Sequence, residues 1–176
     1  YRAVWRQPLQ VTLAQERLLI TSPPPSAGGL SIAQALLMLQ QLPWQQATGA
    51  QQVHLIVEAM RRAYRDRGLL GDPDFIDNPL QQLLAQEHLQ QLLAGLDTQR
   101  ASDSSKLGEF APVHEGSQTT HFAVLDREGN AVAATLSLNM MFGAAFTVPD
   151  SAILLNDQMD DFAADVGASN AYGLVG

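Results

Sequence analysis

The sequence predicts an α+β fold in which helices dominate the first two thirds and strands dominate the remainder. Three observations support this prediction. Apolar residues recur at helical spacing in two segments before residue 70, and two strand-like segments joined by a short turn follow residue 118. A stretch rich in Ser, Gly and Pro separates the two regions. We therefore expect residues 1–118 to be mainly helical and residues 119–176 to be rich in strands.

The first predicted elements are a short strand and a helix. Residues 1–10 show no clear pattern, whereas Arg17–Thr21 is predicted to be a strand that ends before three consecutive prolines. Two glycines then precede a predicted helix over Ser31–Leu42, which Pro43 ends. The apolar residues of this helix predict its buried face: Ile32, Ala35, Leu36, Leu39 and Leu42.

The next segments are also predicted to be helical. A helix is expected over Ala50–Arg67, followed by a turn-rich loop over Gly71–Pro79 and one or two short helices within Leu80–Leu96. The apolar residues of the long helix predict its buried stripe: Val53, Ile56, Val57, Met60 and Tyr64. The charged residues predict its exposed face: Glu58, Arg61, Arg62, Arg65 and Asp66.

A change of composition precedes the predicted strands. Residues 97–118 are rich in Ser, Asp, Gly, Pro and Glu and lack periodicity, which predicts a mobile linker. Thr120–Leu125 and Ala131–Leu138 lie on either side of an Asp-Arg-Glu-Gly-Asn turn, which predicts a hairpin. A further strand is expected over Ala152–Asn156.

Composition argues against several classes of function. The 176 residues include 18 acidic and 10 basic ones, a net charge of −8, so nucleic acid and anionic membranes are poor partners. No apolar run approaches the roughly 18 residues that a membrane-spanning helix needs. The chain has no cysteine, which excludes disulfides, thiolate catalysis and cysteine metal sites. Its four histidines are scattered and predict no metal site: His54, His88, His114 and His121.

Thr119 stands where the predicted linker meets the first predicted strand. A threonine at this junction can attack the carbonyl of Gln118, and hydrolysis of the resulting ester then frees the chain at Thr119. The new α-amine, with a reference pKa of about 7.7–8.0, lies beside its own hydroxyl and can act as its base. This is the layout of an N-terminal-nucleophile hydrolase. From spacing alone, a plain strand-initiating threonine is the simpler interpretation.

Four segments resemble the γ-glutamyltransferase (γ-glutamyltranspeptidase) family. Pro23–Gly29 and Leu70–Phe75 are similar to large-subunit signatures. Thr119–Phe122 and Ile153–Phe162 are similar to the start of the small subunit, and all four segments follow the family's order. The resemblance covers essentially the whole chain. It implies part of an N-terminal-nucleophile αββα sandwich, self-cleavage before Thr119 and nucleophilic catalysis by that residue.

The resemblance also implies a second hydroxyl and a set of substrate-binding residues. Ser137 stands where the family usually has a threonine that hydrogen-bonds the nucleophile, and a surface serine is the alternative. Asn139, Gln158 and Asp161 match residues that bind the substrate's α-ammonium group, which has three donors and needs oxygen acceptors. Tyr172 resembles a lid-loop aromatic residue that covers the γ-glutamyl pocket in some members, and an ordinary loop tyrosine is nearly as good an interpretation.

Other residues near these motifs have simpler interpretations. Asp157 stands where the family pattern suggests an asparagine, and the effect of its charge is not assigned. His121 is expected to face the same side as Thr119, but a structural histidine is the better interpretation. The adjacent Asp160 and Asp161 are weak evidence for a metal or glycosidase site. The proline-rich segment lacks the Gly-Lys-Ser/Thr ending of a phosphate loop, so we expect a rigid turn near the site.

The family's reaction is the transfer or hydrolysis of γ-glutamyl groups through a threonine ester, with no cofactor and no metal. The implied partners are glutathione or other γ-glutamyl compounds, acceptor amino acids, peptides or water, and the remainder of the chain's own large and small subunits. The implied location is the periplasm or the extracellular medium. Two alternatives stay open: a related acylase acting on glutaryl or β-lactam amides, and a non-catalytic homologue.

We expect this chain to be a piece of a larger protein with little or no activity by itself. In the family pattern, the arginine that binds the substrate's α-carboxylate should precede Tyr1, and the oxyanion donors should follow Gly176. Removal of one oxyanion donor can cost a factor of about 10²–10³ in rate.

Overall fold

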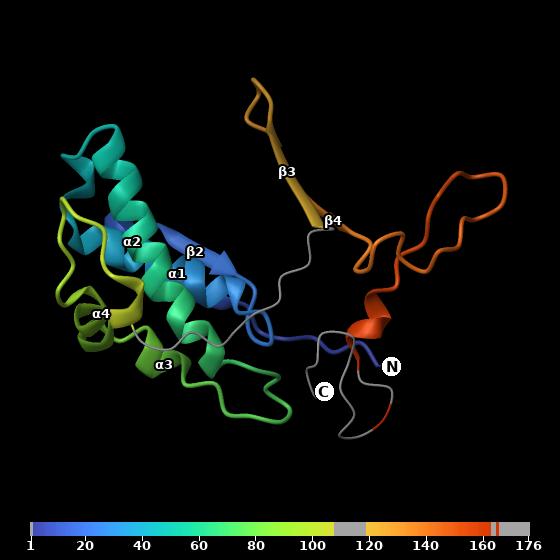
Figure 1. Cartoon of the computed structure of the whole chain (residues 1–176), viewed down its shortest axis with the longest axis horizontal. Coiled ribbons are helices and arrows are strands. Elements are labelled where there is room, and N and C mark those ends of the chain that lie inside the picture. Colours follow the sequence, from blue (N-terminus) through green and yellow to red (C-terminus); the bar gives the residue numbers. More distant parts are fainter. Residues whose placement is uncertain (1, 108–118, 163–164, 166–176) are drawn as a thin grey trace. The chain divides into compact units, whose positions relative to one another are not determined.

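Helices are the main elements of the first part of the chain, and a hairpin is the main element in the described residues of the second. A computed structural model describes residues 2–107, 119–162 and 165. The chain divides into Tyr1–Ala111 and Pro112–Gly176, called unit 1 and unit 2 below (Figure 1). The predicted α+β class is confirmed, whereas the predicted domain boundary at Thr119 stays a prediction. None of the helices among the described residues is long and apolar enough to cross a membrane.

Unit 1 begins with a two-stranded antiparallel sheet. β1 (Leu9–Thr12) pairs with β2 (Leu18–Thr21) and is connected to it by the short helix η1 (Ala14–Glu16). The strand predicted over Arg17–Thr21 is confirmed from Leu18 onward. β1 is not evident in the sequence because a run of four residues is too short to establish a period.

α1 (Gly28–Gln41) begins three residues before the predicted helix and buries a different face. A Cβ atom on Gly29 would lie 2.0 Å from the carbonyl oxygen of Ser22, so the close approach of this helix to the end of β2 requires glycine. Of the predicted face only Ala35 is buried, and Ile32 is 52% exposed. The residues that α1 buries are Gly29, Leu30, Ala33, Gln34, Ala35 and Met38.

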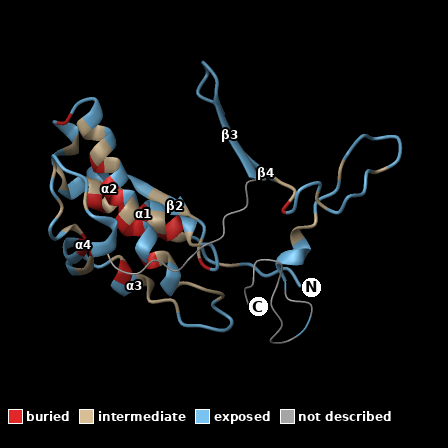
Figure 2. Cartoon of the chain, viewed as in Figure 1, coloured by how far each residue is buried: buried red, intermediate tan, exposed pale blue. Residues whose placement is uncertain are grey.

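The core of unit 1 lies between α1, α2 (Ala50–Asp66) and α4 (Gln86–Leu93). In Figure 2 the buried residues follow α1 and α2, which lie side by side, and continue onto α3 and α4. α3 (Leu80–Leu83) precedes α4, so the prediction of short helices after a turn-rich loop is confirmed. The clustered core residues are Ala35, Met38, Ala59, Ala63, Leu89 and Leu92.

The predicted orientation of α2 is wrong. Its bounds agree with the prediction to within one residue, but Val53 and Met60 of the predicted buried stripe are 61% and 58% exposed. Glu58 and Arg62 of the predicted exposed face are instead only 1% and 2% exposed. The physical reason is that these two charged side chains find partners inside unit 1.

Glu58 and Arg62 belong to a buried hydrogen-bond network. Arg62 Nη1 lies 2.5 Å from Glu58 Oε2, and Arg62 Nε donates to the carbonyl of Leu92 at 2.7 Å. Ser102 donates to the Glu58 carboxylate from its hydroxyl at 2.5 Å and from its backbone N–H at 3.1 Å. Burial raises the pKa of Glu58, but the bonds from Ser102 and Arg62 outweigh burial and lower that pKa to about 2. Glu58 and Arg62 are therefore both charged, and their buried charges are balanced by each other and by the surrounding hydrogen bonds.

The same contacts correct the prediction for the segment after α4. Residues 97–107 were expected to be part of a mobile linker, but Ser102 is bound to Glu58 as described above. Arg61 Nη2 also donates to the Ser102 carbonyl at 3.0 Å and to Ser104 Oγ at 2.7 Å. This half of the predicted linker is thus attached to α2, and the short helix η4 (Ser104–Lys106) follows it. Residues 108–118 lie outside the described residues.

A second buried polar cluster joins α1, α2, α3 and α4. Gln34 Nε2 donates to Asp66 Oδ2 at 2.7 Å and to the carbonyl of Leu83 at 2.9 Å. His88 Nε2 lies 2.6 Å from the same Asp66 oxygen. The cluster therefore fixes α1, α2, α3 and α4 by side-chain contacts as well as by apolar packing.

Unit 2 contains the predicted hairpin, formed by β3 (Thr119–Leu125) and β4 (Ala131–Ser137). In the connecting loop, the Asp126 carboxylate accepts from the backbone N–H of Asn130 at 2.8 Å and from its side-chain amide at 2.7 Å. The Asn130 side chain thereby holds the pKa of Asp126 below its usual value. These bonds close the loop locally and determine which residues of the two strands face each other.

The strand predicted over Ala152–Asn156 is wrong. This segment makes only one isolated bridge, between Thr147 and Leu154. Asp150 and Ala152 have positive φ angles of 61° and 54°, so the backbone leaves the extended conformation that a strand needs. A short helix, η5 (Gln158–Asp161), follows.

Candidate active site

Two predicted site hydroxyls meet at one end of the hairpin. Thr119 is the first residue of β3 and Ser137 is the last residue of β4, and the antiparallel register places them opposite each other. Thr119 Oγ1 donates a hydrogen bond to Ser137 Oγ at 3.0 Å. Ser137 Oγ also accepts from the backbone N–H of Asn139 at 3.2 Å. One serine oxygen therefore links the proposed nucleophile to the start of the proposed ammonium site.

The next pair along the same face of the hairpin is also polar. His121 Nδ1 lies 2.8 Å from Thr135 Oγ1. His121 is two residues after Thr119, so both side chains lie on one face of β3. The contact agrees with the interpretation of His121 as a hydrogen-bonded structural histidine. The opposite face of the hairpin is apolar and exposed, with Phe122, Val124, Val132 and Leu136.

Asn139 is the best-fixed of the predicted substrate-binding residues. It is 7% exposed and its φ angle is 71°, in the left-handed region that asparagine tolerates better than most residues. Its side-chain Nδ2 donates to the backbone carbonyl of Asp157 at 3.2 Å. The end of β4 is therefore joined to the segment just before η5.

Gln158 and Asp161 are the two ends of η5. The backbone N–H of Gln158 is bonded to Asn156 Oδ1 at 3.0 Å. Gln158 Nε2 is buried and has no hydrogen-bond partner among the described residues. Asp161 is exposed. A hollow of about 420 Å³ lies beside Ser137, lined also by Thr120, Leu136, Leu138, Leu154 and Asn156.

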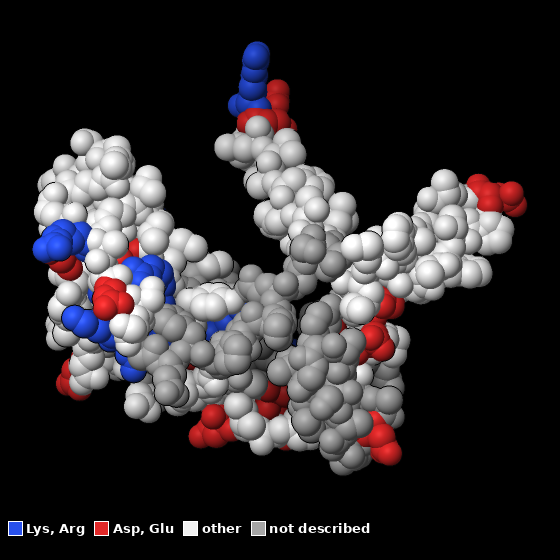
Figure 3. All heavy atoms as spheres, viewed as in Figure 1, with Lys and Arg blue, Asp and Glu red and all other residues white. Residues whose placement is uncertain are grey.

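The described part of unit 2 is acidic. Its only Lys or Arg residue is Arg127, which lies in the loop at the tip of the hairpin, where Figure 3 shows basic and acidic side chains together. The acidic residues are Asp126, Glu128, Asp150, Asp157, Asp160, Asp161 and Asp165. An excess of negative charge favours a positively charged substrate group. Within the described residues, no three His, Asp or Glu side chains gather in a way that could hold a metal ion.

Two predicted site features lie outside the described residues. They are Gln118, on the far side of the proposed cleavage bond, and Tyr172, the proposed lid aromatic. The roles of Thr119, Ser137, Asn139, Gln158 and Asp161 also stay predictions, although the structure brings Thr119, Ser137 and Asn139 into one hydrogen-bonded chain.

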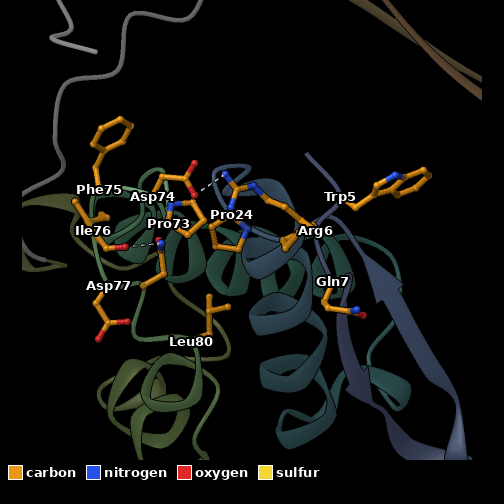
Figure 4. A pocket seen from close by; sticks show the side chains of 12 residues that line it. Trp5, Arg6, Gln7, Pro24, Pro73, Asp74, Phe75, Ile76, Asp77 and Leu80 are labelled. Carbon is orange, nitrogen blue, oxygen red and sulfur yellow. Dashed lines mark hydrogen bonds and ion pairs between the residues drawn. The ribbon is translucent and has the colours of Figure 1, made fainter. Parts of the chain in front are cut away.

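Two segments that resemble large-subunit signatures, Pro23–Gly29 and Leu70–Phe75, meet in unit 1. Both contribute to the lining of an open pocket of about 680 Å³. Pro23 and Pro24 line it together with the loop that contains Pro73, Asp74 and Phe75 (Figure 4). Arg6 Nη2 lies 3.1 Å from Asp72 Oδ1 and 3.3 Å from Asp74 Oδ1, so it attaches the segment before β1 to this loop. In Figure 4 the Trp5 and Phe75 side chains point away from this ion pair. Among the described residues, no predicted catalytic or substrate-binding residue lines this pocket.

Sequence reasoning missed the contacts of Asp157. It contacts Leu138, Asn139 and Met140 through backbone and side-chain atoms. Its place directly before Gln158 in the small-subunit motif was the available signal. The long-range pairing with the end of β4 is not visible in the sequence.

Comparison with known proteins identifies the relatives of the chain. The family model described as Gamma-glutamyltranspeptidase matches residues 1–176. The glutathione hydrolase proenzyme of Pseudomonas sp. (strain A14) is 43% identical over 159 residues, which cover 89% of this chain and 28% of that protein. The Escherichia coli (strain K12) glutathione hydrolase proenzyme is 40% identical over 181 residues, which cover 100% of this chain and 31% of that protein.

Solved structures give the same relationship. The γ-glutamyltranspeptidase from Pseudomonas nitroreducens complexed with L-DON matches 61% of this chain and 33% of its own, with a TM-score of 0.55 and 29% identity. The Helicobacter pylori γ-glutamyltranspeptidase matches 65% of this chain and 34% of its own, with a TM-score of 0.53 and 27% identity. The chain thus spans about a third of the length of these proteins.

Proposed function

Since the chain belongs to the γ-glutamyltranspeptidase family, we propose that it supplies the nucleophile and the ammonium-binding residues of an enzyme that transfers or hydrolyses γ-glutamyl groups. The observation that carries the proposal is the 3.0 Å bond between the hydroxyls of Thr119 and Ser137. It lies at the first residue of a strand, where an N-terminal nucleophile has to stand.

The first reaction is self-cleavage. Thr119 Oγ attacks the carbonyl carbon of Gln118, the C–N bond breaks, and the chain continues through an ester. Water then hydrolyses the ester, which leaves a carboxylate on Gln118 and an α-amine on Thr119. The amine has a reference pKa of about 7.7–8.0, so it can take the hydroxyl proton near neutral pH. The Ser137 hydroxyl, already bonded to Thr119 Oγ1, orients the attacking oxygen.

The mature enzyme repeats this chemistry on a substrate. Thr119 Oγ attacks the γ-carbonyl of a γ-glutamyl amide, the amine leaves with a proton, and a γ-glutamyl ester remains. Water or the amino group of an amino acid or peptide then takes the γ-glutamyl group. The relatives are named glutathione hydrolase proenzymes, and we take glutathione as the donor.

Substrate recognition is assigned to the residues beyond the nucleophile. Asn139, Gln158 and Asp161 surround the substrate's α-ammonium group with oxygen acceptors, and Tyr172 covers the γ-glutamyl pocket. The acidic balance of unit 2 supports this assignment, because an ammonium group is stabilised by nearby carboxylates. A glutaryl or β-lactam acylase would not require such an ammonium-binding site.

We further propose that the active protein is a longer polypeptide with an αββα sandwich, and that this chain alone has little or no transferase activity. The chain spans only about a third of its relatives. The hairpin also exposes an apolar face, including Val124 and Leu136 at 56% and 61%. Such a face is buried in a layered fold.

The proposal is tested by intact-mass measurement over time on the chain and on a longer precursor, each beside its Thr119→Ala variant. We expect wild-type precursor to split between Gln118 and Thr119, with the new amino terminus reading Thr-Thr-His-Phe, and the variant to stay whole. Turnover of γ-glutamyl-p-nitroanilide should fall by several orders of magnitude in the variant. An uncleaved wild-type precursor would indicate a non-catalytic homologue, and turnover by the chain alone would overturn the need for further polypeptide.

A further inference from the structure

We propose that Asp157 is the positioning residue of the γ-glutamyl-binding site, because it joins the end of β4 to η5 and so sets the spacing between Asn139 and Gln158. This inference rests on the proposed function. Asp157 itself is assigned no contact with substrate. It acts through the two residues that it holds.

The first part of the argument is the set of contacts with the end of β4. The backbone N–H of Asp157 donates to the carbonyl of Leu138 at 3.2 Å. The Asp157 carbonyl accepts from Asn139 Nδ2 at 3.2 Å, and Asp157 Oδ1 accepts from the backbone N–H of Met140 at 3.0 Å. One residue therefore binds three consecutive residues that directly follow Ser137.

The second part is the contact with η5. The Asp157 carbonyl also accepts from the backbone N–H of Asp160 at 2.8 Å, within the turn that places Gln158 and Asp161. The same carbonyl oxygen thus receives one bond from the β4 side and one from the η5 side. A shift of Asp157 would move Asn139 and Gln158 relative to each other.

The third part is the orientation of Asn139. Its amide nitrogen faces the Asp157 carbonyl, so the amide oxygen is turned away from Asp157. An ammonium group has only donors and needs that oxygen. The Met140 N–H bond to the carboxylate holds the adjoining backbone while Asn139 keeps its φ angle of 71°. The backbone carbonyl of Asp157 thus binds the nitrogen end of the amide, and the bond from Met140 N–H to the Asp157 carboxylate holds that carbonyl in place.

The Asp157 carboxylate suits this role, but another side chain with an oxygen acceptor can replace it. An asparagine at position 157 would offer an amide oxygen to the Met140 N–H in the same place, but a neutral acceptor makes a weaker bond than a charged one. An alanine would leave the Met140 N–H without its acceptor. The proposal thus predicts that asparagine largely replaces Asp157 and that alanine does not.

The test compares Asp157→Ala and Asp157→Asn in the complete precursor, with Glu128→Ala as the control. Glu128 is an exposed acid in the hairpin loop and is assigned no role in the site. With γ-glutamyl-p-nitroanilide we expect Asp157→Ala to raise KM about tenfold while kcat changes by less than about threefold. The asparagine variant should stay within about threefold of the wild-type KM, and the control should match wild type.

A combined substitution separates positioning from a general loss of structure. If Asp157 acts through Asn139 and Gln158, adding Asp157→Ala to a variant that carries both Asn139→Ala and Gln158→Ala should change KM little further. Additive effects, an unchanged KM in Asp157→Ala, or equal KM values for the alanine and asparagine variants would each overturn the inference. If Asp157→Ala does not fold, Asp157→Leu, which keeps the side-chain size but has no acceptor for the Met140 N–H, takes its place, and an unchanged KM in that variant overturns the inference equally.

Failure of the proposed function has a different signature. In that case wild-type precursor neither cleaves before Thr119 nor turns over the substrate, and the positioning role falls with it. An active wild-type enzyme with an indifferent Asp157 contradicts the positioning role alone.

Discussion

The Glu58 network of unit 1 and the hydroxyl pair of unit 2 use polar groups in opposite ways. Glu58 and Arg62 are almost fully buried and bind partners 30 to 44 residues away in the chain. Thr119 is exposed, and Asn139 is the only buried residue among those described in unit 2. Unit 1 therefore encloses its own polar network, whereas the strands of unit 2 present their faces outward.

The two units therefore differ in what stabilises them. A two-stranded hairpin is marginal by itself in water, so the site geometry of unit 2 depends on burial that further polypeptide would supply. The helices of unit 1 have their own core and two buried polar clusters, so their packing does not depend on further polypeptide. Substitutions in the Glu58 network should change the free energy of unfolding, and substitutions in the Thr119–Ser137 pair should change the reaction rate.

The largest effect is expected for Glu58→Gln. Removing one partner of a buried ion pair leaves the Arg62 charge uncompensated, so the free energy of unfolding of unit 1 should fall by about 3–5 kcal/mol. Denaturant unfolding of the purified chain measures this loss. Glu87→Gln, at an exposed position on α4, is the matched control and should change stability by less than about 0.5 kcal/mol. Equal effects of the two substitutions would contradict the importance of the network.

A smaller effect, on rate alone, is expected for Ser137→Ala. Loss of the hydrogen bond to Thr119 Oγ1 should slow cleavage before Thr119 and substrate turnover by about 10- to 100-fold. Thermal unfolding should be almost unchanged, because Ser137 is only half-buried. Ser137→Thr retains the hydroxyl and should keep most of the activity. The hydroxyl pair has no catalytic importance if the alanine variant cleaves as fast as wild type.

The smallest and most gradual effect is expected from acid. The pKa of Glu58 is lowered from 4.5 to about 2 in the folded chain. Because the folded-state pKa is depressed, the contribution of Glu58 is fully present above about pH 4.5 and is lost as the pH falls toward about 2. Melting temperatures of wild type and Glu58→Gln, measured from pH 6 to pH 2, should therefore converge as the pH falls. A constant difference across this range would show that the Glu58 charge does not carry the stabilisation.

The positions of the helices and of the hairpin could be read from the sequence, but their buried faces could not. The apolar residues of α2 have helical spacing, and this gave correct bounds together with the wrong face. Local periodicity carries no information about Leu92 and Ser102, which compensate Arg62 and Glu58 from distant parts of the chain. Burial of a charged pair is a long-range property.

The residues of the candidate site were predicted from the family resemblance, and their roles stay predictions. The facing positions of Thr119 and Ser137 follow from the length of the strands and of the turn between them, both of which are local. The binding of Asp157 to residues 138–140 is not local, and only the structure reveals it. The strand predicted over Ala152–Asn156 failed because the left-handed backbone at Ala152 has no apolar-pattern signature.

The bonds between Asp126 and Asn130 have a consequence for how the chain could diversify. Side chains on a strand alternate between faces, so adding or removing one residue in this loop would place a leucine, Leu136 or Leu138, opposite Thr119 in place of Ser137. The loop lies at the far end of the strands from Thr119. The length of the loop is therefore constrained by a pair of hydroxyl groups that it never touches, and Asp126 and Asn130 hold the loop at that length.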